Sequence, residues 1–341
     1  MVSDMSRALI LGGTGAIGRA TASRLLEAGW DVQVTGRDWR HLPDEVVNRG
    51  GTFIAADRED RVALAAAMGT GADLLVDCLC YNASHATALL ELARDATATV
   101  MISSKAVYVD DAGNHTNAMT PPHFSGPIME TQATVEAGDS DYRTRDGYPA
   151  CKVAAERVLL DSALPVTVIR PSKIHGVGAA PPREWVFVKR VLDRRSTAFF
   201  ANRGASVDHT TAAANLAALI EAIAARPGSR ILNCGDPTAP STLEISRVIR
   251  GYFGHDWREV LLEEDTQLGH YLWDAPYPLV LDMNAARELG YTPVGTYEET
   301  VTAEVEWLLS LATRGDGGFE LPGVDAPLVD YTAEDRFLAR H

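Results

Sequence analysis

The chain has 341 residues, of which 46% are hydrophobic, and this is enough to bury a core in one large domain or two smaller ones. Its 31 basic and 46 acidic residues give a net charge of −15, which argues against a nucleic-acid partner, so any anionic ligand must be held by a local pocket. The first apolar run, residues 8–11, is too short for a signal peptide, and no window approaches the roughly 20 apolar residues of a membrane span. We therefore expect a soluble, cytoplasmic protein with no membrane partner.

The first half of the chain alternates short apolar runs with stretches whose apolar residues recur every three or four positions. This alternation is typical of β-α-β units that build a parallel sheet. The predicted strands are 8–11, 32–35, 52–55, 74–79, 99–103 and 166–170, and the predicted helices between them are 17–28, 61–67, 84–95 and 149–162. The order predicts an α/β fold, a Rossmann-type doubly wound parallel sheet, with ligands bound beyond the carboxyl ends of its strands.

Later segments break this alternation. Residues 110–146 are rich in Asp, Gly, Thr and Pro and predict a long, functional loop. After Arg170 the pattern predicts isolated helices and one short strand: helices at 185–194, 211–225, 243–252, 285–289 and 298–311, and a strand at 230–233. We expect a dinucleotide-binding domain over residues 1–170 and a smaller substrate-binding lid over 171–313, with the strand at 230–233 a candidate to return to the sheet. A loosely packed C-terminal tail is expected over 314–341.

Gly12, Gly15 and Gly18 follow the first predicted strand with the spacing G-x-x-G-x-x-G and lead into the first predicted helix. Glycine allows a sharp turn, lets backbone N–H groups approach a pyrophosphate, and lets a helix pack closely against a strand. In this strand-turn-helix setting we interpret the motif as a dinucleotide-binding turn rather than a tight structural turn.

The end of the second predicted strand bears on the choice of dinucleotide. Arg37 stands there in place of an acidic residue that would bind a ribose 2′-hydroxyl, and its guanidinium suits a 2′-phosphate, so we favour NADP over NAD, with Arg40 as a helper. Two alternatives stay open: Arg37 stacks on the adenine only, or Asp38 reaches the ribose. Asp57, after the third strand, either accepts a hydrogen bond from the adenine amino group or caps a helix.

The segment GYPACKVAAERVLL, residues 147–160, places Tyr148 and Lys152 on one face of a helix. Alone, such a pair is commonly a surface feature. The strand before it ends in MISSKAVYV, however, so Ser103 and Ser104 lie at the carboxyl edge of the same sheet, beside the expected nicotinamide. In this setting Ser104, Tyr148 and Lys152 are predicted to be catalytic.

These motifs, together with RPSKIHG at 170–176, resemble the extended short-chain dehydrogenase/reductase superfamily and, within it, the NAD-dependent epimerase/dehydratase family, over about residues 7–235. The resemblance implies that Tyr148 is the general acid/base, that Lys152 pulls the phenol pKa from ~10 toward neutrality and binds the nicotinamide ribose, and that Ser104 orients the substrate oxygen. The cofactor-binding residues it implies are Gly12, Thr14, Gly15, Ala16, Ile17, Gly18, Arg37, Asp57, Arg58, Leu79, Ser103, Tyr148, Lys152, Pro171 and Ile174.

Several positions depart from the family pattern. Lys105 and Ala106 follow Ser104, where sugar-nucleotide dehydratases carry an acidic pair, so water elimination is disfavoured. The segment DCLCYN, residues 77–82, makes the cofactor wall less standard. Lys173 and His175 could touch a phosphate or carboxylate of the substrate, although we favour a structural role for both.

The expected activity is hydride transfer between nicotinamide and a secondary alcohol or ketone of a polar small molecule, for example a sugar or sugar nucleotide. We favour an NADPH-dependent reductase. A sugar-nucleotide epimerase that retains its cofactor and a non-catalytic NADP-binding sensor stay open as alternatives. The resemblance also implies a homodimer formed through the helices at 84–95 and 148–162. The four cysteines lack paired ligand spacing, and no metal site is predicted.

Overall fold

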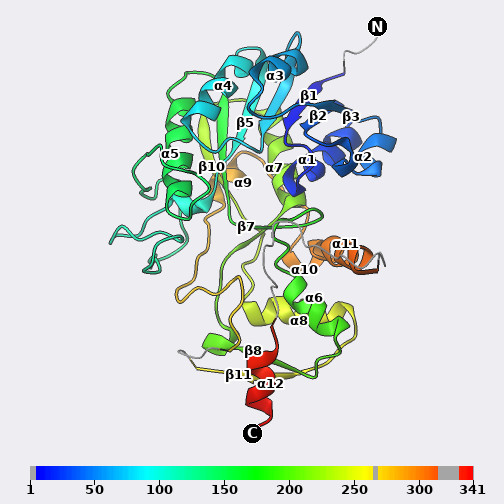
Figure 1. The fold of residues 1–341 in the computed structure, drawn as a ribbon. Helices are drawn as coiled ribbons and strands as arrows, with labels where there is room; N and C mark the ends of the chain where they lie inside the picture. Colours follow the sequence, from blue (N-terminus) through cyan, green and yellow to red (C-terminus); the bar gives the residue numbers. More distant parts are fainter. Residues whose placement is uncertain (1–4, 264–267, 314–329, 341) are drawn as a thin grey trace.

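A computed structural model describes residues 5–263, 268–313 and 330–340. Its centre is a seven-stranded sheet in the order β10-β6-β5-β4-β1-β2-β3, in which every pair of neighbours is parallel (Figure 1). The strands are β1 (Arg7–Leu11), β2 (Asp31–Gly36), β3 (Thr52–Ala55), β4 (Ala72–Asp77), β5 (Ala96–Ile102), β6 (Val166–Pro171) and β10 (Arg230–Cys234). The prediction of a Rossmann-type doubly wound sheet is confirmed.

Helices cover both faces of the sheet. One layer contains α1 (Ala16–Glu27), α2 (Asp44–Asn48), α7 (Ala213–Ala225) and α9 (Asn284–Glu288), and the other contains α3 (Arg61–Met68), α4 (Ala83–Ala93) and α5 (Gly147–Leu160). In β1, Ala8 and Ile10 pack toward the first layer while Leu9 and Leu11 pack toward the second. Burial on both faces explains why this strand is apolar throughout rather than alternating.

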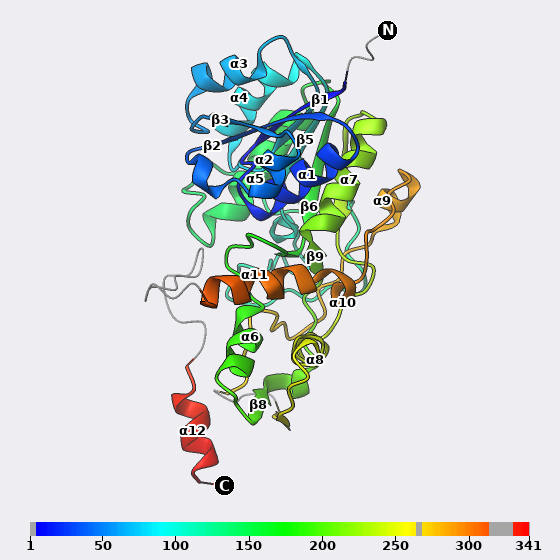
Figure 2. The same cartoon turned by 90° about the vertical axis from the view of Figure 1, so that its right-hand side faces the viewer.

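A second group of elements lies beyond the carboxyl ends of the strands, in the lower half of Figure 1. It comprises α6 (Trp185–Leu192), β8 (Thr197–Phe200), α8 (Thr242–Tyr252), β11 (Arg258–Leu261), α10 (Tyr297–Thr300) and α11 (Thr302–Thr313). An aromatic core that includes Phe187, Trp257 and Trp273 holds it together. The pair β7 (Lys173–His175) and β9 (Thr210–Ala212) lies between this group and the sheet (Figures 1 and 2).

The elements after Arg170 divide between the two groups. The strand expected at 230–233 joins the central sheet as β10, which pairs with β6, and α7 packs against α1. Parts of the range 171–313 therefore complete the sheet and one of its helix layers. A separate lid domain over the whole range stays a prediction.

The C-terminal segment differs from its prediction. Residues 314–329 lie outside the described residues, but Thr332–Leu338 form α12, which packs against the lower group of elements. Glu334 is 7% exposed and pairs with Arg190 at 2.7 Å, and Phe337 contacts Phe199 edge-on at 5.3 Å between ring centroids. The expectation of a loosely packed tail is therefore wrong for α12, because a buried ion pair and an aromatic contact hold it.

The remaining elements are short, and the loop is as long as expected. Three 3-10 turns occur at η1 (Trp39–His41), η2 (Lys105–Val107) and η3 (Ala201–Gly204). Between η2 and α5 the chain forms no regular helix or strand, only isolated bridges such as Ile128 with Leu281. None of the helices in the described part of the chain has the length and apolar content needed to cross a membrane.

Candidate active site

A cavity of about 810 Å³ opens where the chain leaves the carboxyl ends of strands β1 to β6. Nearly every residue that the sequence assigned to the cofactor or to catalysis lines it. These residues are Gly12, Thr14, Gly15, Ala16, Ile17, Gly18, Arg37, Asp57, Arg58, Leu79, Ser103, Ser104, Tyr148, Pro171 and Ile174. Lys152 is the exception, because its side chain lies beneath the cavity wall.

Gly18 and Gly15 of the turn differ in how much room the protein leaves for a side chain. A Cβ on Gly18 would lie 2.5 Å from Gly12 O and from Gly13 Cα, so helix α1 can pack against the turn only without a side chain. A Cβ on Gly15 would meet no atom closer than Gly12 O at 3.8 Å, so protein packing does not exclude a side chain there. Gly15 is also the N-cap of α1 and offers no side-chain cap to its N–H groups. These N–H groups and the positive end of the helix dipole suit a phosphate.

The outer end of the cavity carries Arg37. The Arg37 side chain lines the cavity and is exposed. Asp38, the competing residue, does not line it: its carboxylate accepts hydrogen bonds from Arg40 N at 3.0 Å and Arg40 Nη2 at 2.7 Å. The Asp38 alternative is therefore disfavoured, because Arg40 already binds its carboxylate.

The alternative role of Asp57 as a helix cap is not seen, because Asp60 caps α3.

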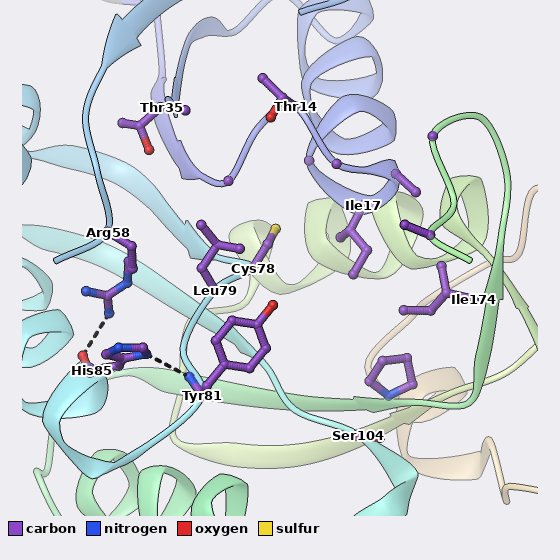
Figure 3. Close-up of a pocket in the computed structure, with 18 of the residues that line it drawn as sticks. Thr14, Ile17, Thr35, Arg58, Cys78, Leu79, Tyr81, His85, Ser104 and Ile174 are labelled. Atoms are coloured by element: carbon purple, nitrogen blue, oxygen red, sulfur yellow. Dashed lines mark hydrogen bonds between the residues drawn. The ribbon is translucent and has the colours of Figure 1, made fainter. Parts of the chain in front are cut away.

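Arg58 faces the cavity but is held by the protein. Its guanidinium donates to Asp77 Oδ2 at 2.6 Å and to His85 O at 2.8 Å, and the second bond is drawn in Figure 3. This buried pairing connects the segment after β3 to the end of β4.

Ser104 and Tyr148 meet at the inner end of the cavity. Ser104 precedes η2, and its Oγ accepts a hydrogen bond from Ala106 N at 3.1 Å, which fixes the side chain. Tyr148 lies in the first turn of α5, lines the same cavity and is close enough to Ser104 for that side chain to affect its pKa. Burial raises the pKa of the Tyr148 phenol, and Ser104 opposes that rise only in part.

Lys152 is placed differently from its prediction. It is 2% exposed, and its Nζ donates to Cys80 O at 2.7 Å and to Ile102 O at 2.8 Å, the carbonyls just beyond β4 and at the end of β5. Nζ lies 4.5 Å from the ring centroid of Tyr81 and 5.7 Å from that of Tyr148. The predicted shift of the Tyr148 pKa toward neutrality is wrong for this structure, because the two carbonyls hold the ammonium under Tyr81 and burial dominates at Tyr148.

Tyr81 is a cavity residue that the sequence analysis did not single out. Figure 3 shows its ring directed into the pocket, with its backbone N–H bonded to His85 Nδ1 at 3.1 Å. Its ring stacks on Tyr142, from the long loop, at 5.0 Å and 3°. Burial raises the pKa of Tyr81, and Lys152 opposes the rise. The signal that could have identified Tyr81 is its place directly after β4, in the segment that departs from the family pattern.

The helix that carries Tyr148 is anchored below the cavity by Glu156. This carboxylate is 2% exposed and binds Arg170 through Nη2 at 2.5 Å and Nε at 3.0 Å. Ser103 Oγ also donates to Glu156, so Ser103 lines the cavity while its hydroxyl is engaged beneath it. The three contacts connect α5 to the ends of β5 and β6.

Lys105 and Lys173 share one carboxylate, that of Asp208. Lys105 is 6% exposed and contacts Asp208 directly, and Lys173 Nζ lies 3.3 Å from Asp208 Oδ2. Burial lowers the pKa of Lys173 to about 8. Neither lysine lines the cavity, which agrees with the structural role favoured for Lys173.

Comparison with known families and structures gives a consistent result. The model of the NAD dependent epimerase/dehydratase family matches residues 8–235. No curated protein matches the chain. Among solved structures, dTDP-glucose 4,6-dehydratase from Bacillus anthracis str. Ames, in complex with NAD, has a TM-score of 0.67 at 17% identity and covers 89% of this chain and 97% of its own.

Two further solved structures are similar. UDP-glucose 4-epimerase from Thermotoga maritima, with UDP-glucose, has a TM-score of 0.66 at 17% identity, covering 90% of this chain and 99% of its own. MoeE5, in complex with UDP-glucose and NAD, has a TM-score of 0.63 at 18% identity, covering 90% of this chain and 100% of its own. At these identities the likeness supports the fold.

Proposed function

The chain belongs to the NAD-dependent epimerase/dehydratase family, and we propose that within it this enzyme is an NADPH-dependent reductase of a secondary ketone on a polar small molecule. Membership makes it an NAD(P)-dependent enzyme of the short-chain dehydrogenase/reductase type. The observation that carries the proposal is that Ser104 and Tyr148 line the same cavity as the glycine turn.

The cavity fits a dinucleotide along its length. The open position at Gly15 and the N-terminus of α1 would hold the pyrophosphate, and Arg37 would hold a 2′-phosphate on the adenosine ribose. The nicotinamide would then lie toward Ser104 and Tyr148. When bound, the cofactor supplies or accepts a hydride.

The chain's own groups supply the proton. In reduction, the Tyr148 hydroxyl donates its proton to the substrate carbonyl oxygen while the Ser104 hydroxyl hydrogen-bonds the same oxygen. Burial keeps the phenol protonated at neutral pH, because it raises the pKa above the ordinary value. A protonated acid is the form that reduction requires, which supports a reductase.

The substrate we propose is a sugar or a sugar nucleotide. Arg143 and Arg183 bring positive charge to the cavity of a chain whose net charge is −15, and such local cations suit a phosphorylated or carboxylated molecule. The titles of similar structures name UDP-glucose and UDP-glucuronic acid, which supports the same class.

The test is to purify the protein, denature it and measure any released nucleotide, then to assay NADPH consumption with a panel of keto sugars and simple ketones. A site without retained nucleotide, together with NADPH turnover, supports the reductase. Retained NAD(H) with isomerisation of a sugar nucleotide and no net redox change would assign the epimerase instead. Absence of turnover on every substrate, with NADP still bound, would favour the non-catalytic sensor.

Cofactor preference gives a separate prediction. Arg37→Ala is expected to lower kcat/KM for NADPH by about 10–100-fold, because a hydrogen bond to a charged group contributes about 1.5–3 kcal/mol. The value for NADH should change by less than about threefold, since NADH has no 2′-phosphate. Initial rates at varied cofactor concentration measure both.

Arg40→Ala is the matched control for this prediction. Arg40 lies three residues further on and is paired with Asp38 outside the cavity. Its loss should therefore change kcat/KM little for either NADPH or NADH. If wild type prefers NADH, as the NAD in the titles of similar structures would suggest, and Arg37→Ala leaves NADPH use unchanged, the assignment of NADP is wrong.

We also propose a homodimer formed through α4 and α5. These helices pack side by side on one face of the sheet. Light scattering of the purified protein measures the mass directly, and a monomer at micromolar concentration would contradict this interface.

A further inference from the structure

Three buried side chains from distant parts of the sequence converge between the sheet and the lower group of elements. His175 ends β7, Glu184 is the N-cap of α6, and Glu304 lies in α11, which crosses the junction in Figure 2. Their exposed fractions are 1%, 1% and 0%. One ligand atom from each side chain lies within 4.8 Å of the other two.

Each of the three side chains has one polar atom held by the protein and one without a hydrogen-bond partner. Glu184 Oε1 accepts from the Tyr297 hydroxyl at 3.3 Å, and Glu304 Oε2 accepts from Gly176 N at 2.5 Å. The atoms without a donor or acceptor from another side chain type are His175 Nδ1, Glu184 Oε2 and Glu304 Oε1, and the two glutamates interact with each other. Leaving a buried polar atom unpaired costs about 1–3 kcal/mol. The glutamate oxygens are satisfied by a proton shared between them or by a ligand, and a ligand would also satisfy His175 Nδ1.

Asp236 determines which nitrogen of His175 carries the hydrogen. Its Oδ2 lies 2.9 Å from His175 Nε2, and its carboxylate also accepts from Thr210 Oγ1 at 2.7 Å and Ala212 N at 2.7 Å. A carboxylate with these donors is placed to accept the Nε2–H, which leaves the lone pair on Nδ1, the ring nitrogen without a partner. A carboxylate that orients a metal-binding imidazole is a recurrent arrangement in metal sites.

The charges of the cluster also need a cation. Asp236, Glu184 and Glu304 carry three negative charges if ionised, and Arg183 is close enough to interact with both glutamates. One guanidinium does not balance three buried carboxylates, so a cation among them would be favourable.

We propose that His175 Nδ1, Glu184 Oε2 and Glu304 Oε1 bind a divalent transition-metal cation, and that Zn²⁺ is the best match. Zn²⁺ binds imidazole nitrogen together with carboxylate oxygen, whereas Mg²⁺ and Ca²⁺ prefer all-oxygen sites. The ion would join β7, α6 and α11 at a point one residue from Ile174 and one residue from Arg183, both of which line the cofactor cavity. Its role is therefore structural support of that wall, and it does not depend on the proposed reaction.

The experiment uses the full-length protein after removal of metals with a chelator. Addition of Zn²⁺ is expected to load one ion per chain by elemental analysis and to raise Tm, while Mg²⁺ at the same concentration should not. Co²⁺ in place of Zn²⁺ should give visible absorption from a coordinated ion. Absence of stoichiometric Zn²⁺, Mn²⁺ or Co²⁺ and of any Tm shift would overturn the proposal in favour of a proton shared between the two glutamates.

Two variants and a matched control locate the ion. Glu304→Gln and Glu184→Gln each keep the shape of the side chain and should each reduce Zn²⁺ affinity at least tenfold and abolish the Tm shift. Glu306→Gln changes an exposed carboxylate two residues away in the same helix and should leave loading unchanged. Equal Zn²⁺ loading of all three variants would show binding elsewhere and would overturn the assignment, and the second variant keeps the test decisive if one variant fails to fold.

Discussion

Tyr148→Phe is expected to lower kcat for ketone reduction by about 10²–10⁴-fold, which is the range for loss of a general acid. The substitution removes only the hydroxyl, and the half-buried ring still fills its place. Affinity for NADPH should therefore change little. Steady-state rates and a separate fluorescence titration of NADPH measure the two quantities.

Tyr81→Phe is the matched control, because Tyr81 is a second phenol in the same cavity. We expect a loss of less than about tenfold, since Ser104 affects the pKa of Tyr148 and is not among the groups that shift the pKa of Tyr81 most. The comparison is sharp because the Lys152 ammonium lies nearer to the Tyr81 ring than to the Tyr148 ring. If Tyr81→Phe abolished turnover and Tyr148→Phe did not, the proton donor would be Tyr81.

The pH profile checks the same assignment from its sign. Because burial raises the pKa of Tyr148, the phenol stays protonated through neutral and mildly alkaline pH. The rate of reduction should be flat between about pH 6 and 9, below the ordinary phenol pKa of ~10. Oxidation of the alcohol needs the phenolate, so its rate should rise over that interval. A reduction rate that already declines as pH rises from 6 to 8 would contradict a raised pKa of Tyr148.

Glu156→Gln is expected to lower the free energy of unfolding by about 3–5 kcal/mol, because it leaves the buried Arg170 guanidinium without its counter-charge. Both side chains of this pair are less than 5% exposed, so water cannot replace the lost interaction. The Arg170 guanidinium also lies 4.7 Å from the Tyr108 ring centroid, which offsets a small part of the loss. Urea denaturation followed by circular dichroism measures the change.

Glu136→Gln is the control for the buried pair. Glu136 lies 3.5 Å from Arg157 on the same helix that Glu156 anchors, but these side chains are 94% and 55% exposed. An exposed ion pair contributes little, so no shift of the midpoint is expected. Equal stability of wild type and Glu156→Gln would show that Arg170 is compensated by other groups.

Strand β3 begins and ends where expected, and α1 differs from its predicted range by one residue at each end, because apolar patterning is a local property. The elements β7, β9 and α2 were missed because they are short and most of their residues are polar, whereas three of the four residues of β3 are apolar. Helix α12 was mistaken for part of a tail because its partners Arg190 and Phe199 lie far away in the sequence.

The sequence by itself determined the sheet, the glycine turn, and the meeting of Ser104 and Tyr148 at one sheet edge, since parallel strands bring their carboxyl ends together and each motif is local. Only the tertiary structure decided which phenol Lys152 would approach and that His175, Glu184 and Glu304 would converge. Both outcomes depend on separations of a few ångströms between side chains on different elements. Electrostatic interactions vary steeply over such distances, and these distances cannot be derived from the spacing of residues along the chain.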